Sequence, residues 1–197
     1  MSKNVCVFSS SSNTLDESFY QDAREIGILL AQNGMNLVYG GSCVGMMYET
    51  AKEVKKNGGR VFGVMPKRLY DFGVASAECD EFFLTDDMRD RKAKLDELSD
   101  SVVALAGGFG TLEELSEMIV QKQLGYNNKA IVILNTNGFY DNMIKFFEDI
   151  IENSFARSES RELYYVAQNP QEAIQYLKNY IPSDKVILKD DIYTQTL

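Results

Sequence analysis

Short apolar segments alternate along the chain with longer segments in which apolar residues recur every three or four positions. The short segments, rich in β-branched and aromatic residues, predict strands at residues 5–8, 36–39, 60–65, 81–84, 101–105, 130–134 and 163–166. The longer segments predict amphipathic helices at residues 15–32, 44–56, 86–98, 111–124, 139–153 and 170–180. Strands and helices therefore follow one another along almost the whole chain.

This alternation predicts the fold class. Strands separated by helices pair in parallel, through right-handed crossovers. The nearly all-apolar runs VVALA and AIVIL suit strands that are covered on both faces. We therefore expect an α/β protein with a doubly wound, mainly parallel, Rossmann-like sheet and helices on both faces. Residues 1–180 are expected to form a single nucleotide-binding domain, and residues 181–197 a polar C-terminal tail.

Composition narrows the classes of function. The 197 residues are 45% apolar and 25% charged, with a formal net charge of −9. An acidic chain is a poor match for bulk nucleic acid or an acidic membrane, because both attract positive charge. No apolar run approaches the roughly 18 residues of a membrane span. We expect neither nucleic acid nor membrane as a partner.

Two residue types narrow the possible chemistry. The chain has no histidine, which excludes Ser–His and Cys–His nucleophile pairs, histidine metal ligands and a histidine general base. The three cysteines, Cys6, Cys43 and Cys79, have no CxxC spacing and indicate reduced thiols in a cytoplasmic protein. Any acid–base chemistry must use other side chains, and no metal or cofactor is expected.

The candidate functional residues lie at one edge of the predicted sheet. In a parallel sheet, every loop that leads from a strand into a helix lies at the carboxyl ends of the strands, where ligands bind. Four such segments are unusual here: Ser9-Ser10-Ser11-Ser12-Asn13, Gly40-Gly41-Ser42-Cys43-Val44-Gly45, the helix start with Arg89, Arg91 and Lys92, and Gly107-Gly108-Phe109-Gly110-Thr111.

The segment from Gly107 to Thr111 is the strongest candidate for binding an anion. Its glycines let a ligand approach the backbone, and the free N–H groups of a helix start favour a phosphate. No G-x-x-x-x-G-K-[ST] string occurs, and the loop after the first strand has no G-x-G-x-x-G fingerprint. These absences weigh against Mg-ATP and NAD as ligands.

Structural explanations compete with each functional one. Thr111 and Glu114 form a T-x-x-E capping box, in which Glu114 would bind the backbone of Thr111, and residues 14–17 have the same form. Arg91 lies among charged residues that are typical of a solvated helix face. The serines and glycines would also suit plain turns.

Three motifs in register resemble the Lonely guy (LOG) family, formerly described as lysine decarboxylases. Residues 107–114, GGFGTLEE, resemble its PGGxGTxxE signature, and residues 88–92, MRDRK, resemble its M-x-x-R-K motif. Residues 40–47, GGSCVGMM, are similar to its glycine-rich second loop. Ala106 stands where the signature has proline, Arg89 where histidine is common and Ser10 where a glycine is usual, and residues 70–77 hold no glutamate at the expected substrate-binding position.

The resemblance implies a Rossmann-like homodimer that hydrolyses the N-glycosidic bond of nucleoside 5′-monophosphates, such as AMP or cytokinin-type ribotides. Carried over by position, the catalytic residues would be Arg91 and Glu114. The residues expected to bind substrate are Lys92, Gly107, Gly108, Phe109, Gly110, Thr111, Glu113, Gly40, Gly41, Ser9 and Ser10.

Two other readings stay open. Related Rossmann-like proteins bind molybdenum cofactor, so the chain is alternatively a non-catalytic nucleotide or cofactor carrier. Lysine decarboxylation is disfavoured, because no lysine can be assigned as the Schiff-base residue that such an enzyme needs. The presence of both Arg91 and Glu114 favours the hydrolase over the carrier.

Overall fold

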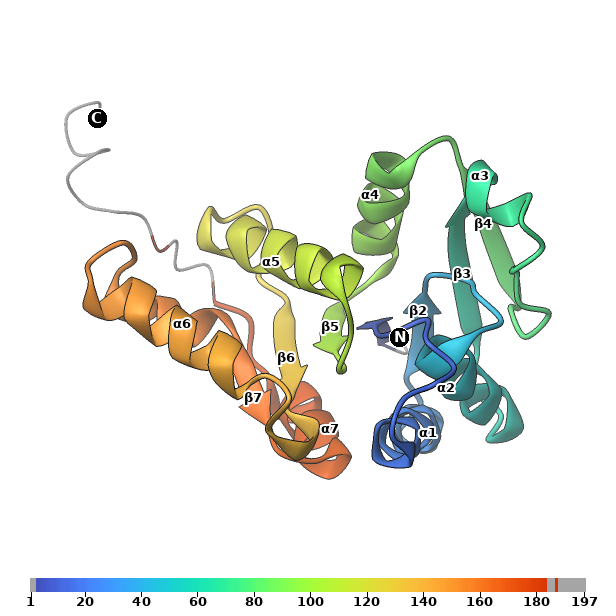
Figure 1. The fold of residues 1–197 in the computed structure, drawn as a ribbon, viewed down its shortest axis with the longest axis horizontal. Helices are drawn as coiled ribbons and strands as arrows, with labels where there is room; N and C mark the ends of the chain where they lie inside the picture. The colour runs from blue at the N-terminus through green and yellow to red at the C-terminus, as the bar shows by residue number, and fades with distance from the viewer. Residues whose placement is uncertain (1–2, 184–186, 188–197) are drawn as a thin grey trace.

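Seven strands form one sheet through the middle of the protein, in a computed structural model that describes residues 3–183 and residue 187 (Figure 1). Its spatial order is β4-β3-β2-β1-β5-β6-β7, and every neighbouring pair is parallel. The strands are β1 (Asn4–Phe8), β2 (Asn36–Tyr39), β3 (Val61–Pro66), β4 (Glu81–Thr85), β5 (Ser101–Ala104), β6 (Ala130–Leu134) and β7 (Tyr165–Ala167). The predicted doubly wound parallel sheet is confirmed.

Helices cover both faces of this sheet. One apolar core lies between the sheet and α1 (Glu17–Gln32), α2 (Gly45–Lys56) and α7 (Pro170–Asn179). The other lies between the sheet and α4 (Met88–Leu98), α5 (Phe109–Gln123) and α6 (Asp141–Glu152). Alternate strand residues enter alternate cores, as Val5 and Cys6 do, because side chains along a strand point to opposite faces. This explains why the central strands are apolar throughout.

The connection order places a crevice at β1 and β5. From β1 the chain moves outward through β2, β3 and β4, and it then returns to β5 on the other side of β1. Phe8 pairs with Ala104 where these two strands end. Such a reversal of strand order opens a crevice at the carboxyl ends of the strands, which is where ligands of doubly wound proteins bind.

Two helix starts, those of α5 and α1, decide whether the predicted capping boxes form. Helix α5 begins at Phe109, with Gly108 as its N-cap and no side-chain cap, so Thr111 lies inside the helix. Helix α1 begins at Glu17, and its cap is Asp16, which accepts a hydrogen bond from the Ser18 N–H. Neither T-x-x-E segment therefore forms the capping box that was the structural alternative for it. In each case the chain turns into the helix at a residue other than the threonine.

Smaller differences concern short segments. A turn of helix, α3 (Lys67–Tyr70), follows β3, and 3-10 turns occupy η1 (Thr136–Gly138) and η2 (Ser158–Leu163). Because η2 includes Leu163, the last strand starts two residues later than predicted. Within the described part of the chain, no helix has the length and apolarity to cross a membrane. Most of the predicted tail, residues 181–197, lies outside the described residues.

Candidate functional site

Helix α5 points its amino terminus at the crevice beside β5. The first four N–H groups of a helix have no partner within it, and here they belong to Gly108, Phe109, Gly110 and Thr111. A Cβ built at Gly108 or at Gly110 would meet no atom within 4 Å. The sequence therefore leaves free donors, the positive end of a helix dipole and open space at one place. That combination suits a phosphate.

One turn further along, Glu114 forms a buried ion pair. Its Oε1 accepts a hydrogen bond of 2.6 Å from Nη1 of Arg91, and the two side chains are 10% and 11% exposed. Arg91 comes from the first turns of α4, where Asp87 caps the helix by accepting hydrogen bonds from the N–H groups of Arg89 and Asp90. Arg91 is therefore not a solvated charge, and Glu114 is not a capping residue.

Burial and the positive charge of Arg91 shift the pKa of the Glu114 carboxyl in opposite directions. Removal from water raises the pKa of the Glu114 carboxyl above its ordinary value, and the positive charge and hydrogen bond of Arg91 partly offset that rise. The neighbouring Glu113 raises this pKa further. A carboxylate that is buried, paired and shifted in pKa beside an open helix start is a candidate catalytic group.

Arg91 is fixed on several sides. Its Nε donates a hydrogen bond of 3.3 Å to the backbone carbonyl of Val64 in β3. The guanidinium also lies close to the backbone of Gly40, so that a Cβ built there would sit 2.5 Å from Nη2. The loop after β2 and strand β3 thus form part of the arginine's surroundings.

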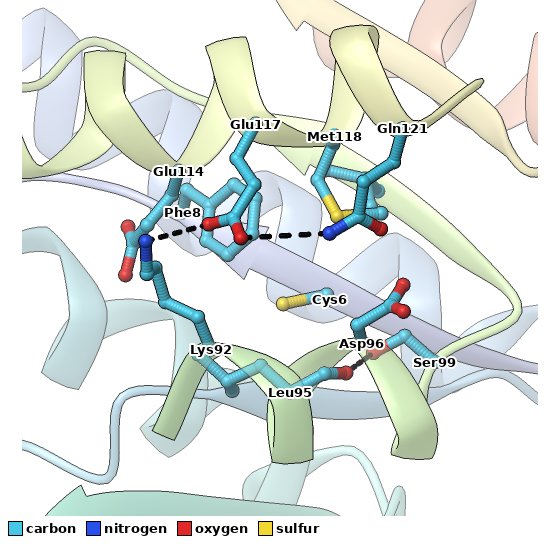
Figure 2. A pocket seen from close by; sticks show the side chains of 11 residues that line it. Cys6, Phe8, Lys92, Leu95, Asp96, Ser99, Glu114, Glu117, Met118 and Gln121 are labelled. Carbon is cyan, nitrogen blue, oxygen red and sulfur yellow. Dashed lines mark hydrogen bonds and ion pairs between the residues drawn. The ribbon is translucent and has the colours of Figure 1, made fainter. Parts of the chain in front are cut away.

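Lys92 joins α4 to α5 beside this pair. Its Nζ forms ion pairs with Glu113 and, at 2.7 Å, with Glu117. Figure 2 shows Lys92 reaching up from α4, with Glu114 and Glu117 projecting from α5 above it. Both acids raise the pKa of Lys92 through hydrogen bonds, so its ammonium form is stabilised. In this structure, the predicted substrate-binding lysine bridges two helices.

A cavity of about 10 Å³ lies between α4, α5 and β1 (Figure 2). That is close to the space needed for one water molecule. Cys6 from β1 projects into it, and Glu114 and Glu117 line it from above. Burial is the main cause that raises the pKa of the Cys6 thiol. Cys6 is therefore an inert core thiol, as an apolar strand residue would suggest.

The serine loop begins where β1 ends, and its first hydroxyl is buried. Ser9 follows β1, is 8% exposed, and its Oγ has no hydrogen-bond partner in the structure. Ser10 instead serves the loop itself: its Oγ accepts from the Ser12 N–H, and its carbonyl accepts from the Met46 N–H at the start of α2. The loops after β1 and β2 are thereby tied together.

The remaining glycines of the predicted site are enclosed by protein. Gly41 has a φ of 71°, and a Cβ there would sit 2.8 Å from the ring of Phe82. A Cβ at Gly107 would sit 2.1 Å from the Thr111 hydroxyl. Both positions need glycine for close packing of the chain, so their direct role in binding stays a prediction.

The sequence-predicted residues thus divide into groups. Two ion pairs, Arg91 with Glu114 and Lys92 with Glu113, connect α4 to α5. Phe109 stands apart, with 91% of its surface exposed. Sequence reasoning missed Glu117, although its spacing of three residues from Glu114 places both on one side of α5. It also missed the carbonyl of Val64, for which no sequence signal exists.

The fold and the site together define a doubly wound α/β protein with a buried carboxylate–guanidinium pair one turn from an open helix start. A family model described as "Possible lysine decarboxylase" matches residues 47–177. The chain belongs to the Lonely guy (LOG) family.

Curated relatives match over almost the whole chain. The protein named cytokinin riboside 5′-monophosphate phosphoribohydrolase LOG5, from Arabidopsis thaliana, is 36% identical over 95% of this chain and 82% of its own length. A probable enzyme of the same kind from Oryza sativa, LOGL2, is 38% identical over 95% of this chain and 77% of its own.

Solved structures share the fold at lower identity. A molybdenum cofactor binding protein from Rippkaea orientalis has a TM-score of 0.71 and 21% identity, over 90% of this chain and 96% of its own. The Moco carrier protein from Chlamydomonas reinhardtii has a TM-score of 0.70 and 26% identity, over the same shares of the two chains.

Proposed function

We propose that this protein hydrolyses the N-glycosidic bond of nucleoside 5′-monophosphates, either AMP or cytokinin-type ribotides, and releases the free base and ribose 5-phosphate. The observation that carries the proposal is the buried pair of Arg91 and Glu114 beside the open amino terminus of α5. The names of the curated relatives, which are phosphoribohydrolases of cytokinin ribotides, support the same reaction.

In this proposal, the start of α5 anchors the 5′-phosphate. The N–H groups from Gly108 to Thr111 donate to its oxygens, and the open space at Gly108 and Gly110 admits them. The unpaired hydroxyl of Ser9, at the neighbouring end of β1, donates a further hydrogen bond to the substrate. Binding energy from the phosphate then positions the ribose against Glu114.

The bond cleaved joins C1′ of the ribose to a nitrogen of the base. As it breaks, its electron pair leaves with the base and C1′ becomes oxocarbenium-like, as in glycoside hydrolysis. The Glu114 carboxylate either stabilises that charge, holds the ribose hydroxyls or orients the water. Water forms the new bond to C1′, and its proton ends on the base. Arg91 holds the carboxylate and stabilises the negative charge that develops on the departing base.

The carrier alternative rests on likeness of fold. The cofactor-binding structures are 21–26% identical to this chain, whereas the phosphoribohydrolases are 36–38% identical. A carrier also has no need for a carboxylate whose burial raises its pKa beside the ligand. We therefore favour the enzyme.

The decisive experiment is a turnover assay. AMP, GMP, CMP, IMP and isopentenyladenosine 5′-monophosphate are incubated with the protein, and free base and ribose 5-phosphate are quantified. We expect equimolar release of both products from at least one of these nucleotides, and much weaker cleavage of adenosine, which lacks the phosphate. Binding of nucleotides without release of base would instead support a carrier.

We also propose a homodimer, formed through the exposed apolar face of α5. This face is lined by Phe109, Leu112, Val120 and Leu124, all at least 38% exposed, and an apolar groove of about 190 Å³ separates α5 from α6. A two-fold contact would bury such a stripe against its own copy. Light scattering at micromolar concentration should give twice the 22.2 kDa chain mass, and Val120→Glu should shift it to the monomer.

A cytoplasmic location is proposed from the cysteines. Cys6, Cys43 and Cys79 are all free thiols in the structure, which suits a reducing compartment. Cell fractionation tests it, and recovery of the protein from an oxidising compartment would contradict it.

A further inference from the structure

The guanidinium of Arg91 passes directly over the backbone of Gly40. A Cβ built at Gly40 would sit 2.5 Å from Nη2 and 3.6 Å from the central carbon of the guanidinium. The backbone of Gly40 itself lies outside the left-handed region, so its conformation does not require glycine. What excludes a side chain at this position is the space that the arginine occupies.

Arg91 has little freedom to give way. Its Nη1 donates to Glu114 at 2.6 Å, and its Nε donates to the carbonyl of Val64 at 3.3 Å. These two hydrogen bonds fix the plane of the guanidinium, and Gly40 lies against it. The side chain is only 11% exposed, so it cannot swing out into solvent without losing both bonds.

We propose that Gly40 is a positioning residue, which holds the Arg91 guanidinium in register with Glu114 by leaving it room against the loop after β2. Nothing in this role requires Gly40 to touch the substrate. The first glycine of this loop then belongs with the proposed catalytic pair, although Arg91 is about fifty residues away in the sequence.

For catalysis, the inference rests on the proposed phosphoribohydrolase. A methyl group at Gly40 would push Nη2 away, and a displacement of about 1 Å at a catalytic group can lower turnover about 100-fold. The same displacement would move the positive charge of Arg91 away from the Glu114 carboxylate and weaken their attraction. The pKa of that carboxyl would then rise further, because burial would be less fully offset.

The test is a double-mutant cycle with two readouts. Gly40→Ala is made in the wild-type protein and in Arg91→Ala, and melting temperature and turnover of the best nucleotide are measured. Gly59→Ala is the matched control: its Cβ would sit 2.7 Å from Val54, its backbone is also outside the left-handed region, and it lies at the opposite edge of the sheet.

We expect Gly40→Ala to lower both the melting temperature and kcat in the wild type, with the acidic limb of the pH profile moved to higher pH. In the Arg91→Ala background, the loss of melting temperature should largely disappear, because the crowded group is gone. Gly59→Ala should lower the melting temperature equally in both backgrounds and leave kcat unchanged.

Two results would overturn the inference. One is an equal fall in melting temperature for Gly40→Ala in both backgrounds. The other is a raised KM with unchanged kcat and pH profile, which would place Gly40 against the substrate. Because melting temperature needs no substrate, the coupling is measurable even if the protein proves not to be a phosphoribohydrolase.

Discussion

The loops after β2 and β5 are both glycine-rich, and their glycines have different surroundings. In the loop after β2, a Cβ at Gly40 would meet Arg91 and a Cβ at Gly41 would meet Phe82, so protein atoms already occupy the space. In the loop after β5, a Cβ at Gly107 would also meet protein, at the Thr111 hydroxyl, but a Cβ at Gly108 or Gly110 would meet nothing within 4 Å. The first loop is packed against the chain's own side chains, whereas the second leaves open space from Gly108 onward.

This contrast shows that a glycine-rich motif has no fixed meaning by itself. Glycine leaves room for something, and only the neighbouring atoms show what that is. Gly45 illustrates the point: its φ is 64°, and a Cβ there would sit 2.5 Å from the backbone of Ser11. Two loops that look equivalent in the sequence thus have different surroundings. Under the functions proposed above, the first positions Arg91 and the second receives the phosphate.

The largest effect is expected at Glu114, the partner of Arg91. Glu114→Gln keeps an acceptor for Arg91 and removes the charge, so turnover should fall by about 100-fold or more. The unfolding free energy should fall by only about 1–3 kcal/mol, the scale of one buried polar contact. Steady-state kinetics and urea denaturation measure the two quantities.

Glu49→Gln is the control for this substitution. Glu49 pairs with Arg24 and Lys52 on α1 and α2, away from the site. The Glu49→Gln variant should keep wild-type turnover. If Glu114→Gln also does so, Glu114 is structural and the hydrolase proposal loses its central residue.

Gly41→Ala probes the enclosed loop. The substitution combines a φ of 71° with a close contact to Phe82, and should lower the unfolding free energy by about 1–3 kcal/mol. Gly34→Ala is the control, since its φ is 66° and its surroundings are empty. Urea denaturation should show the larger loss for Gly41→Ala. Equal losses would mean that the Phe82 ring moves aside without a measurable loss of stability.

Gly110→Ala probes the open loop. It should stabilise the protein, whereas Gly41→Ala should destabilise it. Alanine in the first turn of α5 should raise the unfolding free energy by about 0.5–1 kcal/mol. Its methyl group would enter the space assigned to the phosphate, so KM for AMP should rise about tenfold, a cost near 1.4 kcal/mol. Cleavage of adenosine should change little. An unchanged KM for AMP would show that the phosphate binds elsewhere.

The pH dependence sharpens the assignment of Glu114. Burial raises the pKa of its carboxyl, so kcat/KM should fall on the acidic side at a higher pH than an ordinary glutamate would give. Glu113 contributes to this rise through its negative charge. Glu113→Gln should therefore move the acidic limb to lower pH. Ionisation of the substrate phosphate is common to both proteins, and an unmoved limb would exclude Glu114 as the titrating group.

The fold was predictable because its signals are local. Strands such as AIVIL and helices with regular apolar spacing identify themselves within about ten residues. Arg91 and Glu114 could be chosen as candidates because each lies in a short motif that resembles one of the LOG family; their catalytic role stays a prediction. In both cases, the decisive residues stand close together in the sequence.

Predictions from the sequence were wrong or incomplete where a residue's role depends on contacts with residues far away in the sequence. The T-x-x-E pattern at Thr111 is a sound local signal for a cap, but α5 starts two residues earlier and Glu114 turns to Arg91 on another helix. The surroundings of Gly40 depend on an arginine about fifty residues away. Glu117 acts through Lys92, again across two helices. Such contacts leave no pattern in a single sequence.

The smallest effect is expected at Ser9, in the crevice between the two loops. Its buried Oγ lacks a partner, so Ser9→Ala should leave the unfolding free energy unchanged or raise it by up to about 1 kcal/mol. If the hydroxyl donates to the substrate, KM for AMP should rise by about three- to tenfold, the scale of one neutral hydrogen bond. Ser160→Ala is the matched control, because its hydroxyl is also buried and unpaired, but it lies in η2, away from the site. Both variants should show the same change in stability, and only Ser9→Ala should change KM. Equal KM values for the two would show that the hydroxyl of Ser9 takes no part in binding, and would leave the start of α5 as the anchor.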